Sequence, residues 1–252
     1  MSNWDNLRNE LDHWQEAGLL AGMWWRDDDA VEVTPALDHI LALEQCYHVP
    51  LALAVVPAGV NAALVARLAE TLDTRVLQHG WNHENHAPAG QKKQELDDVR
   101  HLGDVVADIR RGFDVLSGHF GNRFLPVMVP PWNRIADDVV ATLPSLGIQG
   151  LSTFNTRKVA FPVPGLLQVN CHVDVIDWKG SRGFVGEDSC LAALVAHLSA
   201  RRAGQADRDE ATGLLTHHLV HDAPTNMFLD DLFSFEHPAL KWLTIPGVFP
   251  WQ

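Results

Sequence analysis

The stretch GMWWRDDD, residues 22–29, joins a short apolar run to three consecutive aspartates. Short apolar runs bounded by polar residues are typical of buried strands. Similar runs recur along the chain, and each is followed by a polar or helical segment. The runs span residues 22–26, 51–56, 75–78, 124–129, 148–154, 166–169 and 213–216.

The segments between these runs have apolar residues at three-to-four spacing, which predicts amphipathic helices. Strands that alternate with helices predict an α/β fold with a parallel sheet and right-handed crossovers. The alternation itself leaves open whether the sheet closes as a barrel. We also expect residues 1–21 to form an N-terminal helix packed on the outside, with its pattern clearest over residues 4–20. The remaining predicted helices span residues 34–45, 61–72, 92–116, 136–146 and 188–203.

Length and composition limit the possible functions. With 252 residues, the chain suits one catalytic domain over residues 1–252. A formal net charge of −13 opposes nucleic-acid binding, and no apolar stretch is long enough to span a membrane. Residues 1–22 lack the uninterrupted apolar segment of a secretory signal, which favours a cytoplasmic location. Cys46, Cys171 and Cys190 have no metal-type spacing and predict free thiols.

Polar clusters follow several of the predicted strands. The three aspartates follow the first run, His79 follows the third, and His217 follows the last. Because functional groups of parallel α/β folds sit at the carboxyl ends of strands, we expect these clusters on one rim.

The three adjacent aspartates and the nearby histidines suggest a metal site. Crowded carboxylates have raised pKa values unless a cation lies nearby. His79 and His83 are four residues apart, and on a helical turn this spacing puts two imidazoles on one face, as shared metal ligands require. His86 extends this set. The alternatives are an acidic turn that caps the next helix and a solvated polar loop.

Two later clusters suggest acid–base chemistry. His217 and His218 follow the last predicted strand, and one of them is a candidate general acid. The alternative is a histidine-rich loop without a catalytic role. Asp174 lies three residues before Asp177 and is suited to orient a catalytic histidine. Trp178 offers an apolar wall for a sugar ring, unless it belongs to the core.

The order of these clusters resembles the five motifs of the polysaccharide deacetylase family, which includes chitin, chito-oligosaccharide and peptidoglycan deacetylases. The resemblance runs from about residue 25 to residue 222 and implies the family's fold, a distorted (β/α)7 barrel. The motif residues, in chain order, are Asp27-Asp28, His79-x-x-x-His83, Pro130-Pro131-Trp132, Asp174-x-x-Asp177-Trp178 and Leu215-x-His217.

The resemblance also implies roles for these residues. Asp27 matches the family's catalytic base, and His217 matches its acid. Asp28, His79 and His83 match its metal ligands. The other matched residues are Asp174, which sits behind the active site, and Pro131, Trp132, Trp178 and Leu215, which contact the substrate.

The sequence departs from the family pattern at several positions. Asp29 stands where the family has glycine, so it stays open which two of the three aspartates act. Val129 replaces the arginine that orients the base, and Arg134 is expected to substitute for that arginine. His218 remains a rival for the acid, and His86 remains a rival for a metal ligand.

We therefore expect a hydrolase that uses Zn²⁺ or another divalent metal to remove an acyl group, such as acetyl, from the amide nitrogen of an amino sugar or related carbohydrate. Its partner is expected to be a small carbohydrate or N-acyl substrate. Two alternatives remain: a hydrolase of a small cyclic amide or imide on the same fold, and a catalytically silent carbohydrate-binding protein. The sequence does not predict the oligomeric state.

Overall fold

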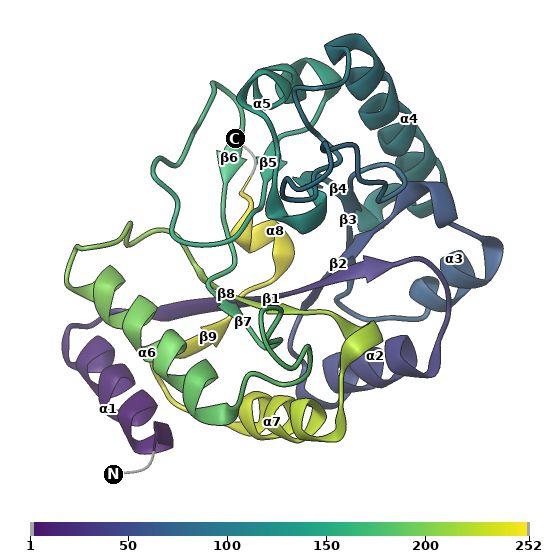
Figure 1. Cartoon of the computed structure of the whole chain (residues 1–252). Coiled ribbons are helices and arrows are strands. Elements are labelled where there is room, and N and C mark those ends of the chain that lie inside the picture. The colour runs from purple at the N-terminus through teal and green to yellow at the C-terminus, as the bar shows by residue number, and fades with distance from the viewer. Residues whose placement is uncertain (1–2, 251–252) are drawn as a thin grey trace.

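The computed structural model describes residues 3–250, and over these residues the strands form one parallel sheet. The strand order is β6-β5-β4-β3-β2-β1-β8-β7, and β9 pairs with the beginning of β1. The sheet curls around an interior, with helices outside it (Figure 1). The strands are β1 (Ala21–Ala30), β2 (Leu51–Val55), β3 (Arg75–His79), β4 (Phe124–Val129), β5 (Gly150–Leu151), β6 (Leu167–Gln168), β7 (Val173–Asp174), β8 (Thr212–Thr216) and β9 (Leu240–Trp242).

The helices cover the outer face of the sheet, except for α8, which packs inside. The expected N-terminal helix is observed as α1, which lies alongside α6 (Figure 1). Residues 1–2 and 251–252 of the predicted single domain lie outside the described residues, and the domain assignment stays a prediction. The helices are α1 (Asn3–Glu16), α2 (Pro35–Tyr47), α3 (Ala62–Ala69), α4 (Leu102–Phe120), α5 (Asp137–Thr142), α6 (Glu187–Arg202), α7 (Ala223–Ser234) and α8 (Ile245–Val248).

Side chains alternate between the two faces of each strand, and this divides the core. Met23 and Trp25 of β1 belong to the apolar cluster shared with the outer helices. Trp24 belongs to the interior cluster, where its ring meets that of Phe249 edge-on at 5.7 Å. The same alternation directs Arg26 and Asp28 of β1 into the interior and Asp27 outward.

Several parts of the chain differ from the sequence prediction. Residues 92–101 form a loop, so the helix expected over residues 92–116 begins only at Leu102. Glu95 of this loop is buried and accepts the backbone N–H groups of Trp81 and Asn82, each at 2.9 Å. The strands β7 and β9 and the helices α7 and α8 were not predicted. Among the described residues, no helix is long and apolar enough to cross a membrane.

Candidate active site

One carboxylate and two imidazoles meet at the carboxyl ends of β1 and β3. Asp29 Oδ1 lies 3.0 Å from His79 Nε2 and 3.2 Å from His83 Nε2. His79 Nδ1 lies 2.9 Å from the carbonyl oxygen of Val129, which can only accept, so Nδ1 carries the proton. In a neutral His79 ring, Nε2 therefore points a lone pair at a carboxylate oxygen. Such a contact needs either a second proton on His79, which then donates to Asp29, or a metal cation between the two atoms.

Asp29, His79 and His83, which we call the rim group, fit a divalent metal. Their ligand atoms all lie within 4.8 Å of one another, and two histidines with one carboxylate are a common set for a zinc ion with open positions. Burial opposes ionisation of Asp29, but hydrogen bonds from the two histidines hold its pKa far below the usual range. Burial alone would lower the pKa of His79, whereas Asp29 raises it.

The backbone around the rim group is strained. Asp29, His83, Trp132 and Asn133 all have positive φ, at 71°, 59°, 55° and 56°. Such conformations cost free energy and tend to occur at functional sites. Gly80 also has positive φ, and a Cβ there would stand 2.1 Å from Glu95 Oε2.

The two rim histidines are therefore joined by a tight loop. The helical turn expected between them is not observed.

Asp28 does not share a candidate metal site with the two histidines, although the family resemblance implied that it is a metal ligand. Its two carboxylate oxygens face the guanidinium of Arg26, with Nε at 2.8 Å and Nη2 at 2.9 Å. The remaining donors of Arg26 bind Ser152 Oγ at 2.7 Å and Asn133 Oδ1 at 2.7 Å. Arg26 and Asp28 are both buried, so this fork, made of the Nη2–Oδ2 hydrogen bond and the close Nε–Oδ1 ion pair, holds the carboxylate inside the barrel.

Arg26 makes the contact with an aspartate of the site that was expected of Arg134. The guanidinium of Arg134 instead donates a hydrogen bond to the carbonyl of Lys93 at 2.8 Å. Sequence reasoning missed Arg26 because it lies within a predicted strand. The available signal was its spacing from Asp28, since residues two apart on a strand share a face.

Asp27 lies on the opposite face of β1 from Asp28. It is fully buried and accepts hydrogen bonds from Thr216 and His218. Burial opposes ionisation of Asp27, but these partners hold its pKa below the usual value. Burial likewise opposes the charged form of His218, whereas Asp27 raises its pKa. Of the two adjacent histidines, His218 is thus paired away from the rim.

His217 is the histidine that faces Asp174. Its Nδ1 lies 4.0 Å from Asp174 Oδ1, which is longer than a hydrogen bond. The ring of Trp178 meets the His217 ring edge-on at 4.8 Å, and Trp178 Nε1 donates to Asp174 Oδ2 at 2.8 Å. Burial raises the pKa of Asp174. His86 is absent from the described groups whose ligand atoms could share one ion.

The residues expected to contact the substrate divide into exposed and buried ones. Trp178 is 44% exposed, and the Trp132 ring lies 4.3 Å from the His83 ring. Leu215 and Pro131 are buried. A cavity of about 430 Å³ adjoins the partners of Arg26, and its lining includes Asn133, Thr153, Gln168, Arg134 and Gln94.

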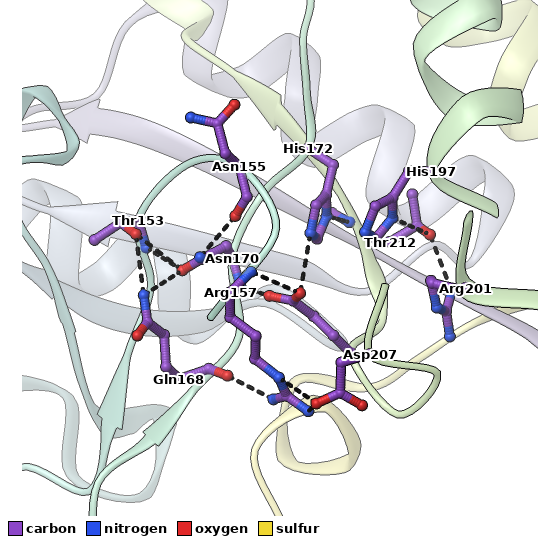
Figure 2. Close-up of polar contacts among 12 residues, drawn as sticks. Thr153, Asn155, Arg157, Gln168, Asn170, His172, His197, Arg201, Asp207 and Thr212 are labelled. Carbon is purple, nitrogen blue, oxygen red and sulfur yellow. Dashed lines mark hydrogen bonds and ion pairs between the residues drawn. The ribbon is translucent and has the colours of Figure 1, made fainter. Parts of the chain in front are cut away.

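A second set of two histidines and a carboxylate lies at the amino-terminal ends of the strands. We call His172, His197 and Glu210 the buried group. The two imidazole rings stack, with centroids 3.4 Å apart and planes 18° apart, and they lie side by side in Figure 2. His172 Nε2 lies 3.4 Å from Glu210 Oε2. Burial lowers the pKa of His172 and, together with the neighbouring His172 and Arg201, lowers the pKa of His197 to about 2.

Glu210 and the Nδ1 atoms of both histidines have hydrogen-bond partners in the protein, whereas the Nε2 atoms of the two histidines have none among the described residues. The backbone N–H of Gly213 donates to His172 Nδ1 at 3.0 Å, so the proton of a neutral His172 is on Nε2, facing Glu210. Glu210 also accepts the backbone N–H groups of Arg157 and Asn170, each at 3.0 Å. The stacked rings also cannot both point their in-plane lone pairs at one ion.

Comparisons with known proteins place this geometry in context. No family model and no curated protein matches the chain. A solved peptidoglycan N-acetylglucosamine deacetylase is 17% identical, with a TM-score of 0.59, covering 96% of this chain and 97% of that one. A polysaccharide deacetylase structure from Mycobacterium smegmatis, described as putative, is 14% identical, with a TM-score of 0.59 and coverage of 92% and 90%.

A family 4 acetyl xylan esterase from Clostridium thermocellum, solved with a cobalt ion, is 17% identical, with a TM-score of 0.55 and coverage of 91% and 90%. These similarities extend over nearly the whole chain, although the identities are low. They confirm the predicted α/β barrel and the resemblance stated from the motifs. The chain has the fold of the polysaccharide deacetylases, a distorted (β/α)7 barrel.

Proposed function

We propose that the protein is a divergent polysaccharide deacetylase, a metal-dependent hydrolase that removes an acetyl group from the amide nitrogen of an amino sugar or related carbohydrate. The observation that carries this proposal is the rim group, in which His79 Nε2 and Asp29 Oδ1 face each other at 3.0 Å. The similarity to a peptidoglycan N-acetylglucosamine deacetylase supports the substrate class.

Asp29, His79 and His83 would hold the metal, with Zn²⁺ as the ion that suits this donor set. The structural similarity to an esterase solved with a cobalt ion supports a divalent ion. A divalent ion supplies Lewis acidity, which activates water and polarises the acyl carbonyl.

Asp28 is the proposed general base, in place of Asp27. Its carboxylate lies in the interior, whereas that of Asp27 is occupied by Thr216 and His218 on the outer face. The Arg26 fork fixes the orientation of the Asp28 carboxylate, so that it can accept the proton of the attacking water.

His217 is the proposed acid that protonates the departing amine. Asp174 lies behind it, with Oδ1 4.0 Å from Nδ1, and the Trp178 ring packs edge-on against the imidazole. The exposed Trp178 and the ring of Trp132 offer walls for a sugar. Leu215 lines the acyl side from the interior.

Acetate release from a panel of N-acetylated chito-oligosaccharides, measured with Zn²⁺-loaded enzyme, tests the proposal. The wild type should release acetate, and Asp28→Asn should lower kcat about 10²- to 10⁴-fold while keeping the metal. Asp29→Asn should lose the metal. Activity that survives Asp28→Asn unchanged would remove Asp28 from the mechanism, and a wild type that binds chito-oligosaccharides without hydrolysing them would favour a silent binding protein.

A further inference from the structure

The carboxylate of Asp27 binds both residues that flank His217. Thr216 Oγ1 donates to Asp27 Oδ2 at 2.6 Å, and the backbone N–H of His218 donates to the same oxygen at 2.9 Å. His218 Nδ1 contacts the other oxygen, Oδ1. One side chain on β1 therefore holds the segment of β8 before and after the proposed acid.

This network is buried, and on the Asp27 side every oxygen has a partner, whereas His218 Nε2 has none within residues 3–250. Trp25 Nε1 donates to Thr216 Oγ1 at 2.8 Å, which leaves the Thr216 hydroxyl proton for Asp27. Asp27 and Thr216 are 0% exposed and His218 is 1% exposed. Water therefore cannot replace a partner that is lost by mutation. Removing one hydrogen bond leaves a buried polar atom without a partner, which costs free energy and disturbs the bonds that remain.

His217 itself lacks a strong anchor. Its nearest acidic atom, Asp174 Oδ1, is 4.0 Å away, and its other recorded contact is the edge-on ring of Trp178. Because side chains alternate along an extended segment, holding residues 216 and 218 on the outer side directs residue 217 to the inner side. The orientation of His217 thus depends on its two neighbours more than on its own contacts.

We propose that Asp27 and His218 form a positioning pair for His217 in the hydrolysis, an inference that rests on the proposed function. Asp27 is adjacent to Asp28 and two residues before Asp29, so it links the strand of the base and metal ligand to the strand of the acid. Neither Asp27 nor His218 touches the substrate.

Kinetics of Asp27→Asn and His218→Ala test this role. We expect kcat for chito-oligosaccharide deacetylation to fall about 10- to 100-fold, because small displacements of a catalytic group are costly. KM and zinc content should stay at wild-type values, since the rim group and sugar walls are untouched. A purely structural role would lower Tm while leaving kcat of the folded enzyme unchanged, and that result would overturn the inference.

A matched pair of variants at position 218 sharpens the test. Asparagine places an amide nitrogen close to the position of the imidazole Nδ1, whereas glutamine places it one bond farther away. His218→Asn should therefore recover most of the kcat lost in His218→Ala, and His218→Gln should recover less. Equal recovery of kcat by the two variants, or no recovery by either, contradicts the hydrogen bond assigned between His218 Nδ1 and Asp27.

Crystal structures of Asp27→Asn and His218→Ala provide a measure that is independent of activity. The inference predicts that His217 leaves its position beside Trp178 while Asp29, His79 and His83 stay in place. If His217 keeps its position in both variants, the inference fails even if the wild type is an active deacetylase. If His217 moves but the wild type hydrolyses no acetylated sugar, the proposed function fails instead.

Discussion

The rim group and the buried group each contain two histidines and one carboxylate, yet hydrogen bonds give His79 and His172 opposite neutral tautomers. In the rim group, the Val129 carbonyl accepts from His79 Nδ1 and leaves Nε2 with a lone pair. In the buried group, the Gly213 N–H donates to His172 Nδ1 and leaves Nε2 with a proton. The first arrangement needs a proton or a metal cation between His79 and Asp29, whereas in the second the proton of a neutral His172 already faces Glu210. We therefore expect the partner of the other ring nitrogen to distinguish a metal site from a site held by protons alone.

Metal content tests most directly whether the rim group binds an ion and the buried group does not. Protein purified without an affinity tag and loaded with Zn²⁺ should hold about one ion per chain by elemental analysis, as the tautomers predict. His79→Ala should lose this ion and at least about 10³-fold in kcat/KM, because the metal supplies several kcal/mol of transition-state stabilisation. His197→Asn is the matched control and should keep both. Two ions per chain, or loss of zinc in His197→Asn, would show that the buried group also binds metal.

Replacing Arg26 tests whether catalysis depends on the contacts by which Arg26 orients Asp28. Arg26→Lys keeps a positive charge but loses the fork that holds Asp28 and the hydrogen bonds to Ser152 and Asn133. We expect kcat to fall about 100-fold, since the base is no longer held in one orientation. Zinc content should not change. Arg134→Lys is the control, and a larger loss of kcat in that variant would return the orienting role to Arg134.

The order of the motifs predicted which strands carry the site, but it did not identify which aspartate does what. A strand that is apolar on one face reveals its inward side by alternation. Here β1 carries tryptophans on both faces, Trp24 inside and Trp25 outside, so the pattern does not say where Asp27 and Asp28 point. The positive φ of Asp29, which turns its side chain to the rim, is also invisible in a sequence.

The fold was predicted best where segments are long and periodic. The strands β1 to β6 and β8 overlap the predicted apolar runs, whereas β7 and β9 were not predicted. The loop over residues 92–101 was mistaken for helix because its spacing is helical. Its conformation depends on Glu95 binding the backbone beyond Gly80, which is a tertiary interaction.

The buried group should contribute to stability and leave catalysis alone. Glu210→Ala would leave two buried backbone N–H groups without an acceptor and would remove the carboxylate that faces His172 Nε2. We expect the free energy of unfolding to fall by about 3 kcal/mol or more, measured by urea denaturation. The exposed neighbour Asp209→Ala is the control and should change it by less than about 0.5 kcal/mol. Similar values for the two variants would contradict the role given to Glu210, as would a loss of kcat/KM in the folded Glu210→Ala enzyme.

The pH dependence of stability gives the smallest and most specific test of the buried group. Burial lowers the pKa of His197 to about 2, whereas an exposed histidine has a pKa of about 6.5. Between these pH values the unfolded chain binds a proton that the folded chain excludes, so the contribution of His197 is complete above about pH 6.5 and is lost as the pH falls. Each such group contributes a slope of about 1.4 kcal/mol per pH unit. In His197→Asn, the amide can still reach Thr212 Oγ1, but the group that titrates is gone. In urea titrations between pH 6 and 5, the free energy of unfolding of this variant should therefore fall less steeply than that of the wild type, by about 1.4 kcal/mol per pH unit. An unchanged slope would mean that His197 accepts a proton in the folded protein, and the stacked pair would then not be held neutral.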